Sequence, residues 1–245
     1  MTTRETGYIE EHCRKLFEYR ELDFRRNCLW PLIKRYVRGR RVLDLGCGYG
    51  QMSLRMARLG YEVTAADISA TMIDALKKMA AALPITALVT DARNVRELGR
   101  DAFDSVVCLD LLEHIDEDDQ VLQDIYCTLK GNGRLVLAVP ALEWLYGIRD
   151  KKLGHVRRYS RYNLKDKLLK SGYEIHTIRY WNLIGLAPYI FFEKILRSEI
   201  YDGMRYSKSP TNRTLNHLLR CILSLENYVP LPAGLSIFAV AQKRP

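Results

Sequence analysis

Short apolar segments alternate with longer segments of helical periodicity through the middle of the chain. The apolar runs begin near residues 41, 61, 85, 103 and 134. The segments of helical spacing between them cover residues 51–60, 69–83 and 116–130. Short strands separated by helices are typical of βαβ units. The pattern therefore predicts a parallel sheet with helices on both faces.

Helix signals also precede and follow this central pattern. Apolar residues recur at helical spacing over residues 8–38, where Pro31 predicts a break or a second helix start. Ser69 is the expected N-cap of the segment that follows the second strand. After the fifth strand, Ser160 and Gly172 are the expected N-cap and stop signal of another helix.

The last third of the chain has two further strand patterns. Residues 173–181 alternate between apolar and polar side chains, and residues 235–243 form a second clear run. The segment between them, residues 183–233, has helical texture. We therefore expect a hairpin at one edge of the sheet, with a helical insertion in its connection.

The composition is that of a globular protein. The chain has 245 residues, of which 48% are hydrophobic and 27% charged, enough for one domain with a sizeable insertion. Its six cysteines form no C-x-x-C pair, so we expect no disulfide framework, no metal site and a reducing, cytoplasmic location. The longest charge-free apolar stretch outside the sheet pattern, residues 181–192, is too short to span a bilayer, and the first residues resemble no secretory signal. The sequence therefore predicts a soluble protein.

The clearest functional signal is the sequence D-x-G-x-G-x-G directly after the first strand. It runs from Asp44 through Gly46 and Gly48 to Gly50. Such glycines permit a sharp turn and let a ligand lie on the backbone beyond the strand ends. The dinucleotide fingerprint G-x-G-x-x-G would need a glycine at Gln51. A nucleoside that carries an amino-acid tail suits this loop better than a dinucleotide.

Acidic residues end the next two strands as well. Asp67 follows the second strand, 21 residues after Gly46, where a carboxylate can accept hydrogen bonds from both ribose hydroxyls. Asp91 follows the third strand, where a carboxylate can accept from an adenine amine. Each acid alone is more typical of a helix cap or a solvated turn. Together they favour one ligand that lies across the edge of the sheet.

The segments VLDLGCGYG, VTAADIS, VTDA, FDSVVCLDLLEHI and GNGRLVLAVP resemble the successive motifs of class I S-adenosylmethionine-dependent methyltransferases. The resemblance is greatest to the small-molecule branch with the ubiquinone-biosynthesis O-methyltransferases, and covers residues 41–182 and 235–242. It implies a Rossmann-like, seven-stranded sheet, mostly parallel, with an antiparallel C-terminal hairpin. It also implies S-adenosylmethionine as cofactor and S-adenosylhomocysteine as product.

The resemblance assigns cofactor-binding roles residue by residue. The glycine loop would line the methionine part, Asp67 would hold the ribose, Ile68 would contact the adenine, and Arg26 would hold the carboxylate. The family pattern differs at Tyr49, often Thr or Gly, and at Asp110, usually Glu. The full set of expected cofactor residues is Arg26, Asp44, Gly46, Cys47, Gly48, Gly50, Asp67, Ile68, Asp91, Ala92 and Leu109.

The resemblance also divides the chain. Residues 1–40 are expected to be helices that cover the cofactor cleft, and residues 41–182 with 234–245 the methyltransferase core. The insertion 183–233 is then a lid over the substrate. An added core layer or a dimer face would explain its apolar residues equally well.

Catalytic residues are harder to predict, because an activated methyl group mainly needs a well-positioned nucleophile. His155 in the sequence GHVRRYS is the first candidate for a general base, since an imidazole titrates close to neutral pH. His114, Glu113 and Tyr159 are the alternatives. Bracing the loop or a structural role remains open for each. Expected acceptor-binding residues are Arg157, Arg158, Trp144 and Tyr146.

Two acceptor classes are disfavoured by the segment after the fourth strand. It contains no Asn/Asp-Pro-Pro-Tyr/Phe sequence, which argues against exocyclic amines of adenine or cytosine. It has no Pro-Cys nucleophile either, and Cys108 lies inside the apolar strand, where we expect it to be part of the core. Both observations argue against methylation at cytosine C5.

Positive charge is concentrated in residues 149–170, where nine basic residues stand against two acids, out of a net charge of +9 for the chain. This segment is either a solvated helix face or a site for a carboxylate, a phosphate or an anionic surface. Three interpretations follow. We expect methyl transfer to an oxygen, less often nitrogen or carbon, of a partly apolar, perhaps anionic or lipid-like small molecule, with peripheral membrane contact an option. The rivals are a tRNA or rRNA methyltransferase, although nucleic acid is not favoured, and a cofactor-binding module without turnover.

Overall fold

The computed structural model describes residues 24–197 and 210–245, together with Arg14 and Glu18. Its centre is a seven-stranded sheet in the order β3-β2-β1-β4-β5-β7-β6. The strands are β1 (Arg41–Leu45), β2 (Glu62–Asp67), β3 (Ile85–Val89), β4 (Phe103–Leu109), β5 (Leu129–Pro140), β6 (Glu174–Trp181) and β7 (Ser236–Gln242). The first five strands are parallel, and β7 runs antiparallel to both β5 and β6. The predicted class I methyltransferase sheet with an antiparallel hairpin is confirmed.

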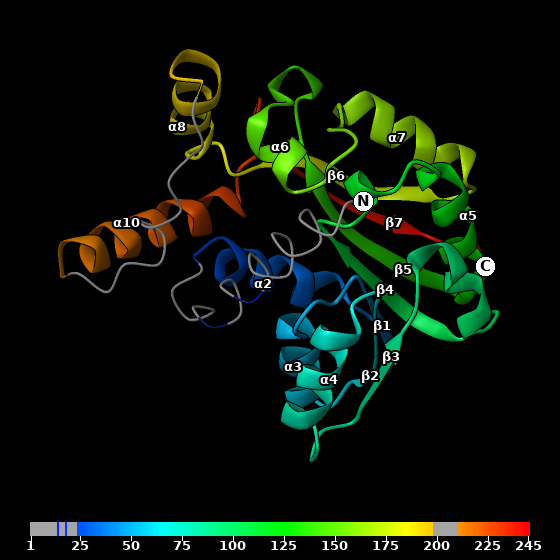
Figure 1. Ribbon diagram of the computed structural model, residues 1–245. Coiled ribbons are helices and arrows are strands. Elements are labelled where there is room, and N and C mark those ends of the chain that lie inside the picture. The colour runs from blue at the N-terminus through cyan, green and yellow to red at the C-terminus, as the bar shows by residue number, and fades with distance from the viewer. Residues whose placement is uncertain (1–13, 15–17, 19–23, 198–209) are drawn as a thin grey trace.

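Helices cover both faces of this sheet (Figure 1). One face packs against α5 (Asp118–Thr128), α7 (Arg161–Lys170) and the short helix η1 (Ala92–Leu98). The other face packs against α2 (Phe24–Tyr36), α3 (Gln51–Arg58) and α4 (Ala70–Met79). Successive strand residues serve opposite faces, so Leu43 belongs to the first core and Val42 to the second.

The predicted N-caps of two helices are confirmed. The Ser69 hydroxyl accepts from the Met72 N–H at the start of α4, and the Ser160 hydroxyl accepts from the Asn163 N–H at the start of α7. Each cap satisfies one backbone donor that has no partner within the helix. Both helices therefore begin one residue after these serines.

Two expected boundaries are wrong. Pro31 breaks no helix: α2 continues through it, because Leu29, Leu32 and Ile33 on either side are buried in the core. The loss of one backbone hydrogen bond at proline is offset by that packing. The fifth strand begins at Leu129 and not near residue 134 as the apolar pattern predicted, so the Gly-Asn-Gly sequence at 131–133 lies inside β5.

The insertion between β6 and β7 is largely helical where the structure describes it. It contains α8 (Leu186–Ile190), the single π-helical turn η4 (Phe191–Ile195) and α10 (Pro210–Glu226), and residues 198–209 lie outside the described part. Figure 1 shows α10 reaching out past α2 and α8 standing away from the sheet. The end of α10 is anchored on α2, where the Asn227 side chain donates to the Cys28 carbonyl. Within the described residues, no helix is both long and apolar enough to cross a membrane.

Three short helical segments follow β4 and β5 at their carboxyl ends. They are η2 (Leu112–His114), η3 (Glu143–Leu145) and α6 (Ile148–Lys152). Since the carboxyl ends of parallel strands share one edge of the sheet, these segments stand beside the glycine loop that follows β1. A Cβ atom on Gly46 would lie 3.0 Å from the Leu111 side chain. This edge holds the candidate site.

Candidate cofactor and active site

The glycine loop turns sharply between β1 and α3. Gly46, Gly48 and Gly50 have φ values of +72°, +55° and +75°, a region that L side chains rarely adopt. The N–H groups of Gly46 and Cys47 both donate to the Ala66 carbonyl at 2.8 and 3.1 Å, which ties the loop to the end of β2. The loop is therefore held in one shape by the neighbouring strand.

The three glycines differ in what surrounds them. A Cβ atom on Gly50 would lie 2.4 Å from the Leu76 side chain, so this glycine is required by packing against α4. A Cβ atom on Gly48 would meet only the Met72 sulfur, at 3.7 Å. The space beside Gly48 is thus open to a ligand that lies against the backbone, as S-adenosylmethionine would need.

Asp67 and Ile68 lie next to this open space. The Gly48 N–H donates to Asp67 Oδ2 at 2.8 Å, and the Ser69 N–H donates to Oδ1 at 2.9 Å. A carboxylate oxygen accepts more than one hydrogen bond, so ribose hydroxyls can still be bound. The Ile68 side chain is 67% exposed, high for so apolar a residue, and offers a surface for a planar base. The Asp67 carboxylate, the exposed Ile68 side chain and the open space beside Gly48 fit the predicted cofactor.

The expected adenine contact at Asp91 has a competing partner. Its carboxylate accepts from the Arg93 side chain and caps η1 through the Arg93 N–H. The hydrogen bonds from the Arg93 side chain are the main reason that the pKa of Asp91 lies below its ordinary value. Ala92, the neighbouring residue in the expected set, is buried. The structure therefore assigns Asp91 a capping role, to which an adenine contact would be added.

Asp44 is buried at the end of β1, where it accepts from the Ser53 hydroxyl of α3. Burial raises the pKa of Asp44 to about 6, although the Ser53 hydrogen bond and the charge of Arg26 act in the opposite direction. Arg26 thus lies within electrostatic reach of the glycine loop. That position agrees with its expected place near the methionine carboxylate.

Arg25, which precedes Arg26, holds the end of β4. Its guanidinium donates to both carboxylate oxygens of Asp110 at 2.7 and 2.8 Å. Burial alone would raise the pKa of Asp110, but the Arg25 charge outweighs it and holds that pKa well below its usual range. This pair fixes α2 against the edge where Leu109 ends the strand.

Glu113, His114 and His155 form a cluster in which one polar atom of each lies within 4.8 Å of the others. The His114 and His155 rings meet edge to face, with centroids 4.7 Å apart. Burial, and then the charge of His155, lower the pKa of His114 to about 4. An imidazole whose pKa is lowered this far is a weak base at neutral pH, so the half-buried His114 is better suited to packing against His155 than to accepting a proton.

The Glu113 carboxyl is buried, and among the described residues neither of its oxygens finds a hydrogen-bond donor. Burial, with the nearby charge of Asp110, raises its pKa well above the ordinary value. Such a group is more stable protonated, because an uncompensated buried charge is costly. His155 Nε2 lies 3.9 Å from Glu113 Oε1.

Tyr159 does not face the site, and the expectation of a catalytic role for it is corrected. Its side chain is fully buried and its hydroxyl donates to Asp118 at 2.8 Å. Burial and the Asp118 charge raise the pKa of Tyr159 above its ordinary value, so the hydroxyl does not act as a base near neutral pH. Arg157 donates to the same carboxylate at 3.0 Å, and Lys167 at 2.9 Å.

Arg158 is also corrected as an acceptor-binding residue. It is buried, and its guanidinium donates to Asp150, to the Ala141 carbonyl and to the Tyr189 hydroxyl. A side chain whose donors are already used inside the protein has little to offer an anionic acceptor. Of the two arginines, Arg157 alone keeps a partly exposed side chain, at 31%.

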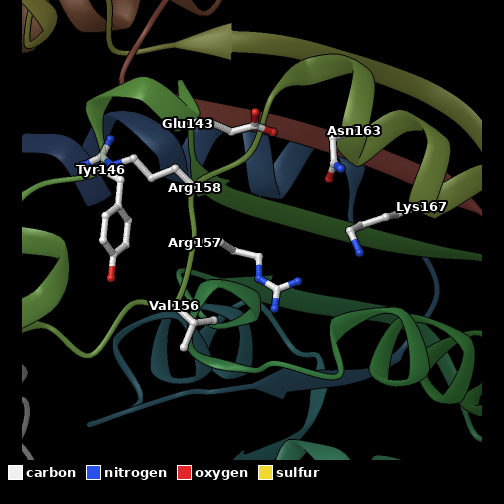
Figure 2. A pocket seen from close by; sticks show the side chains of 7 residues that line it. All are labelled: Glu143, Tyr146, Val156, Arg157, Arg158, Asn163 and Lys167. Atoms are coloured by element: carbon white, nitrogen blue, oxygen red, sulfur yellow. The ribbon is translucent and has the colours of Figure 1, made fainter.

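A cavity of about 380 Å³ lies beside the segment that follows α6. Figure 2 shows the side chains of Arg157, Asn163 and Lys167 around one space, with Tyr146 set apart from them. The remaining lining residues are Glu143, Val156 and Arg158, so the cavity does not reach the glycine loop. The Tyr146 hydroxyl donates to the His155 carbonyl at 2.7 Å, whereas Trp144 is exposed and absent from the lining.

The sequence did not single out Asp150 or Asp118, the acids that organise this region. Asp150 accepts from His155 and Arg158, and Asp118 accepts from Arg157, Tyr159 and Lys167. The sequence did contain a signal for Asp150, because it is an acid five residues before His155 in a mostly basic segment. Fully buried arginine and histidine side chains almost always need such a partner.

The family described as "Methyltransferase domain" matches residues 43–137, which include the glycine loop, Asp67, Asp91 and the β4 edge. Residues 43–137 are therefore similar to a methyltransferase domain. The predicted resemblance to S-adenosylmethionine-dependent methyltransferases is confirmed, and with it the cofactor class.

Curated relatives match about two fifths of the chain. The mitochondrial ubiquinone biosynthesis O-methyltransferase of Schizosaccharomyces pombe is 38% identical over 103 residues, which cover 41% of this chain and 38% of that protein. A ubiquinone biosynthesis O-methyltransferase of Coxiella burnetii is 32% identical over 101 residues, with 40% and 43% covered. The matched region thus spans about two fifths of the length of these relatives.

Solved structures share the fold over most of the chain. An S-adenosylmethionine-dependent methyltransferase of Mesorhizobium loti has a TM-score of 0.61 at 16% identity, covering 88% of this chain and 98% of its own. Phosphoethanolamine N-methyltransferase 2 of Haemonchus contortus, in complex with S-adenosylmethionine, has a TM-score of 0.62 at 20% identity, with 89% and 53% covered. The [4+2]-cyclase SpnF also matches, with a TM-score of 0.56 at 20% identity and 85% and 76% covered. The methyltransferase fold therefore serves more than one kind of chemistry.

Proposed function

We propose that the protein transfers the methyl group of S-adenosylmethionine to an oxygen atom of a small, partly apolar acceptor. The observation that carries this proposal is the open space beside Gly48, bordered by Asp67 and the exposed Ile68. These three residues are the ones expected to contact the methionine, ribose and adenine parts of the cofactor, and they lie next to one another at the edge of the sheet.

The chain would hold this cofactor through groups already oriented. The Gly48 region would receive the methionine part with Arg26 near its carboxylate, and Asp67 would accept from the ribose hydroxyls. When bound, S-adenosylmethionine supplies an activated methyl group on a sulfonium. The protein then has to place the acceptor oxygen in line behind that methyl and to exclude water.

The acceptor class rests on the insertion and on the relatives. Phe191 and Ile195 of η4 and the next residue, Leu196, are exposed, as are Leu218 and Leu225 of α10. Exposed apolar side chains on protruding elements suit a partly apolar or lipid-like acceptor. The relatives named as ubiquinone biosynthesis O-methyltransferases favour oxygen as the receiving atom.

A module that binds the cofactor but transfers no methyl group is the second candidate, because SpnF has the same fold and is named as a cyclase and not as a methyltransferase. The two functions differ in one product. A methyltransferase releases S-adenosylhomocysteine in proportion to acceptor, whereas a module binds the cofactor and releases none. A panel of phenolic, carboxylate and lipid-quinone acceptors, with S-adenosylhomocysteine as readout, therefore separates them.

Gly48→Ala tests the cofactor site itself. The new methyl group would occupy the open space, so we expect S-adenosylmethionine affinity to fall at least about tenfold, or 1.4 kcal/mol. Isothermal titration calorimetry measures this directly.

Gly60→Ala is the matched control. Gly60 also has a positive φ, of +90°, and a Cβ atom there meets nothing within 4 Å. Both variants place a side chain at a positive φ, at a cost of about 1–2 kcal/mol, but only Gly48 borders the proposed site. Equal affinities in the two variants would remove the glycine loop from the binding site.

A further inference from the structure

Asp150 of α6 carries a buried carboxylate that several elements share. It is 0% exposed and accepts from His155 Nδ1 at 2.8 Å, from Arg158 Nε at 2.8 Å and from the Gly147 N–H at 3.0 Å. The Tyr189 hydroxyl of α8 donates to it at 3.2 Å. The carboxylate is thus fixed from different directions and cannot rotate away from His155.

The charge state of Asp150 determines which nitrogen of His155 carries the proton. Burial would raise the pKa of Asp150, but hydrogen bonds from His155 and Arg158 lower it to about 2. An ionised carboxylate only accepts hydrogen bonds, so Nδ1 of His155 must be the donor. In the neutral ring Nε2 then has no hydrogen and presents a lone pair.

Nε2 of His155 faces the edge of the sheet that holds the glycine loop. It lies 3.9 Å from Glu113, whose backbone carbonyl accepts from the Val156 N–H at 2.7 Å. The same segment, through Leu111, lies against Gly46. The His155 side chain is 10% exposed, so the ring is mostly shielded from solvent.

We propose that Asp150 is the positioning residue for His155: it holds the imidazole with hydrogen on Nδ1, so that Nε2 can accept the proton of the acceptor hydroxyl. This inference rests on the proposed methyl transfer. The acceptor O–H bond breaks and its proton goes to Nε2, while the oxygen forms the bond to the methyl carbon. The electron pair of the broken S–C bond stays on sulfur, and the imidazolium returns its proton to solvent.

Groups from every neighbouring element face this pair. Arg158 follows it in the chain and stacks over the Tyr189 ring at 4.6 Å. Glu113 and His114 approach from η2, and the Asp110–Arg25 pair closes the end of β4. Because Tyr189 belongs to the insertion, the orientation of His155 is tied to the element proposed to cover the acceptor.

The first experiment measures the tautomer in the wild-type protein and needs no acceptor. The chain has five histidines, and His155→Ala identifies the signals of His155 in a sample labelled with ¹⁵N-histidine. The samples are prepared with a chelator, so that no adventitious metal occupies Nε2. We expect the neutral ring to carry its hydrogen on Nδ1 and none on Nε2. A protonated Nε2 overturns the proposal, whatever the enzyme transfers.

The second experiment tests action through His155 by kinetics. We expect His155→Ala to lower kcat about 10²–10⁴-fold, the usual contribution of a general base, and Asp150→Asn to lower it within the same range. KM for S-adenosylmethionine should not change in either variant. In the double variant the Asp150 substitution should cost no more than about a further twofold, because both residues serve one step.

Asp166→Asn is the matched control, since Asp166 pairs with Lys170 on the exposed face of α7. It should leave kcat unchanged. Losses that multiply in the double variant would overturn the proposal, because Asp150 would then act independently of His155. If Asp150→Asn fails to fold, the tautomer in the wild-type protein still decides. Absence of turnover with a confirmed Nδ1–H tautomer counts against the proposed function and not against the orientation of His155.

Discussion

The carboxyl of Asp44 is buried and accepts a hydrogen bond from the uncharged Ser53 hydroxyl. Its raised pKa, about 6, means that the folded protein holds the proton more tightly than the unfolded chain does. The corresponding stability is fully present below about pH 4 and is lost as the pH rises through about 6. Side chains in ligand-binding sites often reduce the stability of the folded protein in this way, because their position serves ligand binding and not folding.

Asp44→Asn should remove this pH dependence. The amide keeps an acceptor for Ser53 but carries no charge, so the variant should gain stability over the wild type between about pH 4 and 7. About two pKa units correspond to at most roughly 3 kcal/mol. Urea unfolding of both proteins at several pH values without cofactor measures the difference. A difference that stays constant with pH would show that Asp44 titrates normally.

At the scale of single residues, the sequence predicted which acids would bind the cofactor, but not which side chains compete for them, such as Arg93 at Asp91. The spacing of Asp67 and the glycine loop follows from strand ends that the apolar pattern reveals. Arg157 and Arg158 could not be told apart, because adjacent residues have no distinguishing pattern and only the tertiary structure buries one of them. Asp150 was missed for the same reason, since its partners come from a loop and from the insertion.

Among the elements, the insertion is fastened to the sheet by Glu226 at the end of α10. Its carboxylate accepts from the N–H groups of Asn182, Leu183 and Ile184, where the chain leaves β6. The two ends of the insertion are thereby clasped together. The sequence predicted helices here from periodicity, but not this clasp, because the residues that make it are more than 40 positions apart.

Glu226→Gln should loosen the clasp while the helix itself persists. The side-chain amide offers one acceptor oxygen in place of two, so at least one buried N–H loses its partner, at a cost of about 1–3 kcal/mol. We expect faster hydrogen exchange at residues 182–184 and 223–227 and unchanged exchange in β1 and β4, measured by mass spectrometry. Glu174→Gln, on the exposed start of β6, is the control. Unchanged exchange at 182–184 would show that packing alone holds the insertion.

Over the whole molecule, the excess positive charge is partly neutralised by acids outside the basic segment. Arg157 and Lys167 share Asp118, and Lys167 also contacts Asp119. A surface whose cations already have acidic partners releases fewer counterions when it meets nucleic acid. The structure thus weakens the interpretation of residues 149–170 as an RNA-binding surface.

Binding to tRNA should accordingly depend little on salt. If all nine basic residues contacted phosphates, a plot of log affinity against log salt concentration would have a slope of about −6. We expect a slope shallower than about −2 between roughly 50 and 200 mM salt, measured by fluorescence anisotropy. A steep slope, lost on substituting Arg157 and Lys167 together, would restore the RNA interpretation.

The position of β7 has a consequence for how the protein is made. β7 is the last strand in the chain, yet it lies between β5 and β6. On the ribosome β6 therefore emerges with no strand to pair with, and the free edge of β5 stays open until residues 236–242 have been translated. Such an edge can pair with other nascent chains. The insertion lies between β6 and β7, so it takes its final position only after β7 has been translated and has paired with both neighbouring strands.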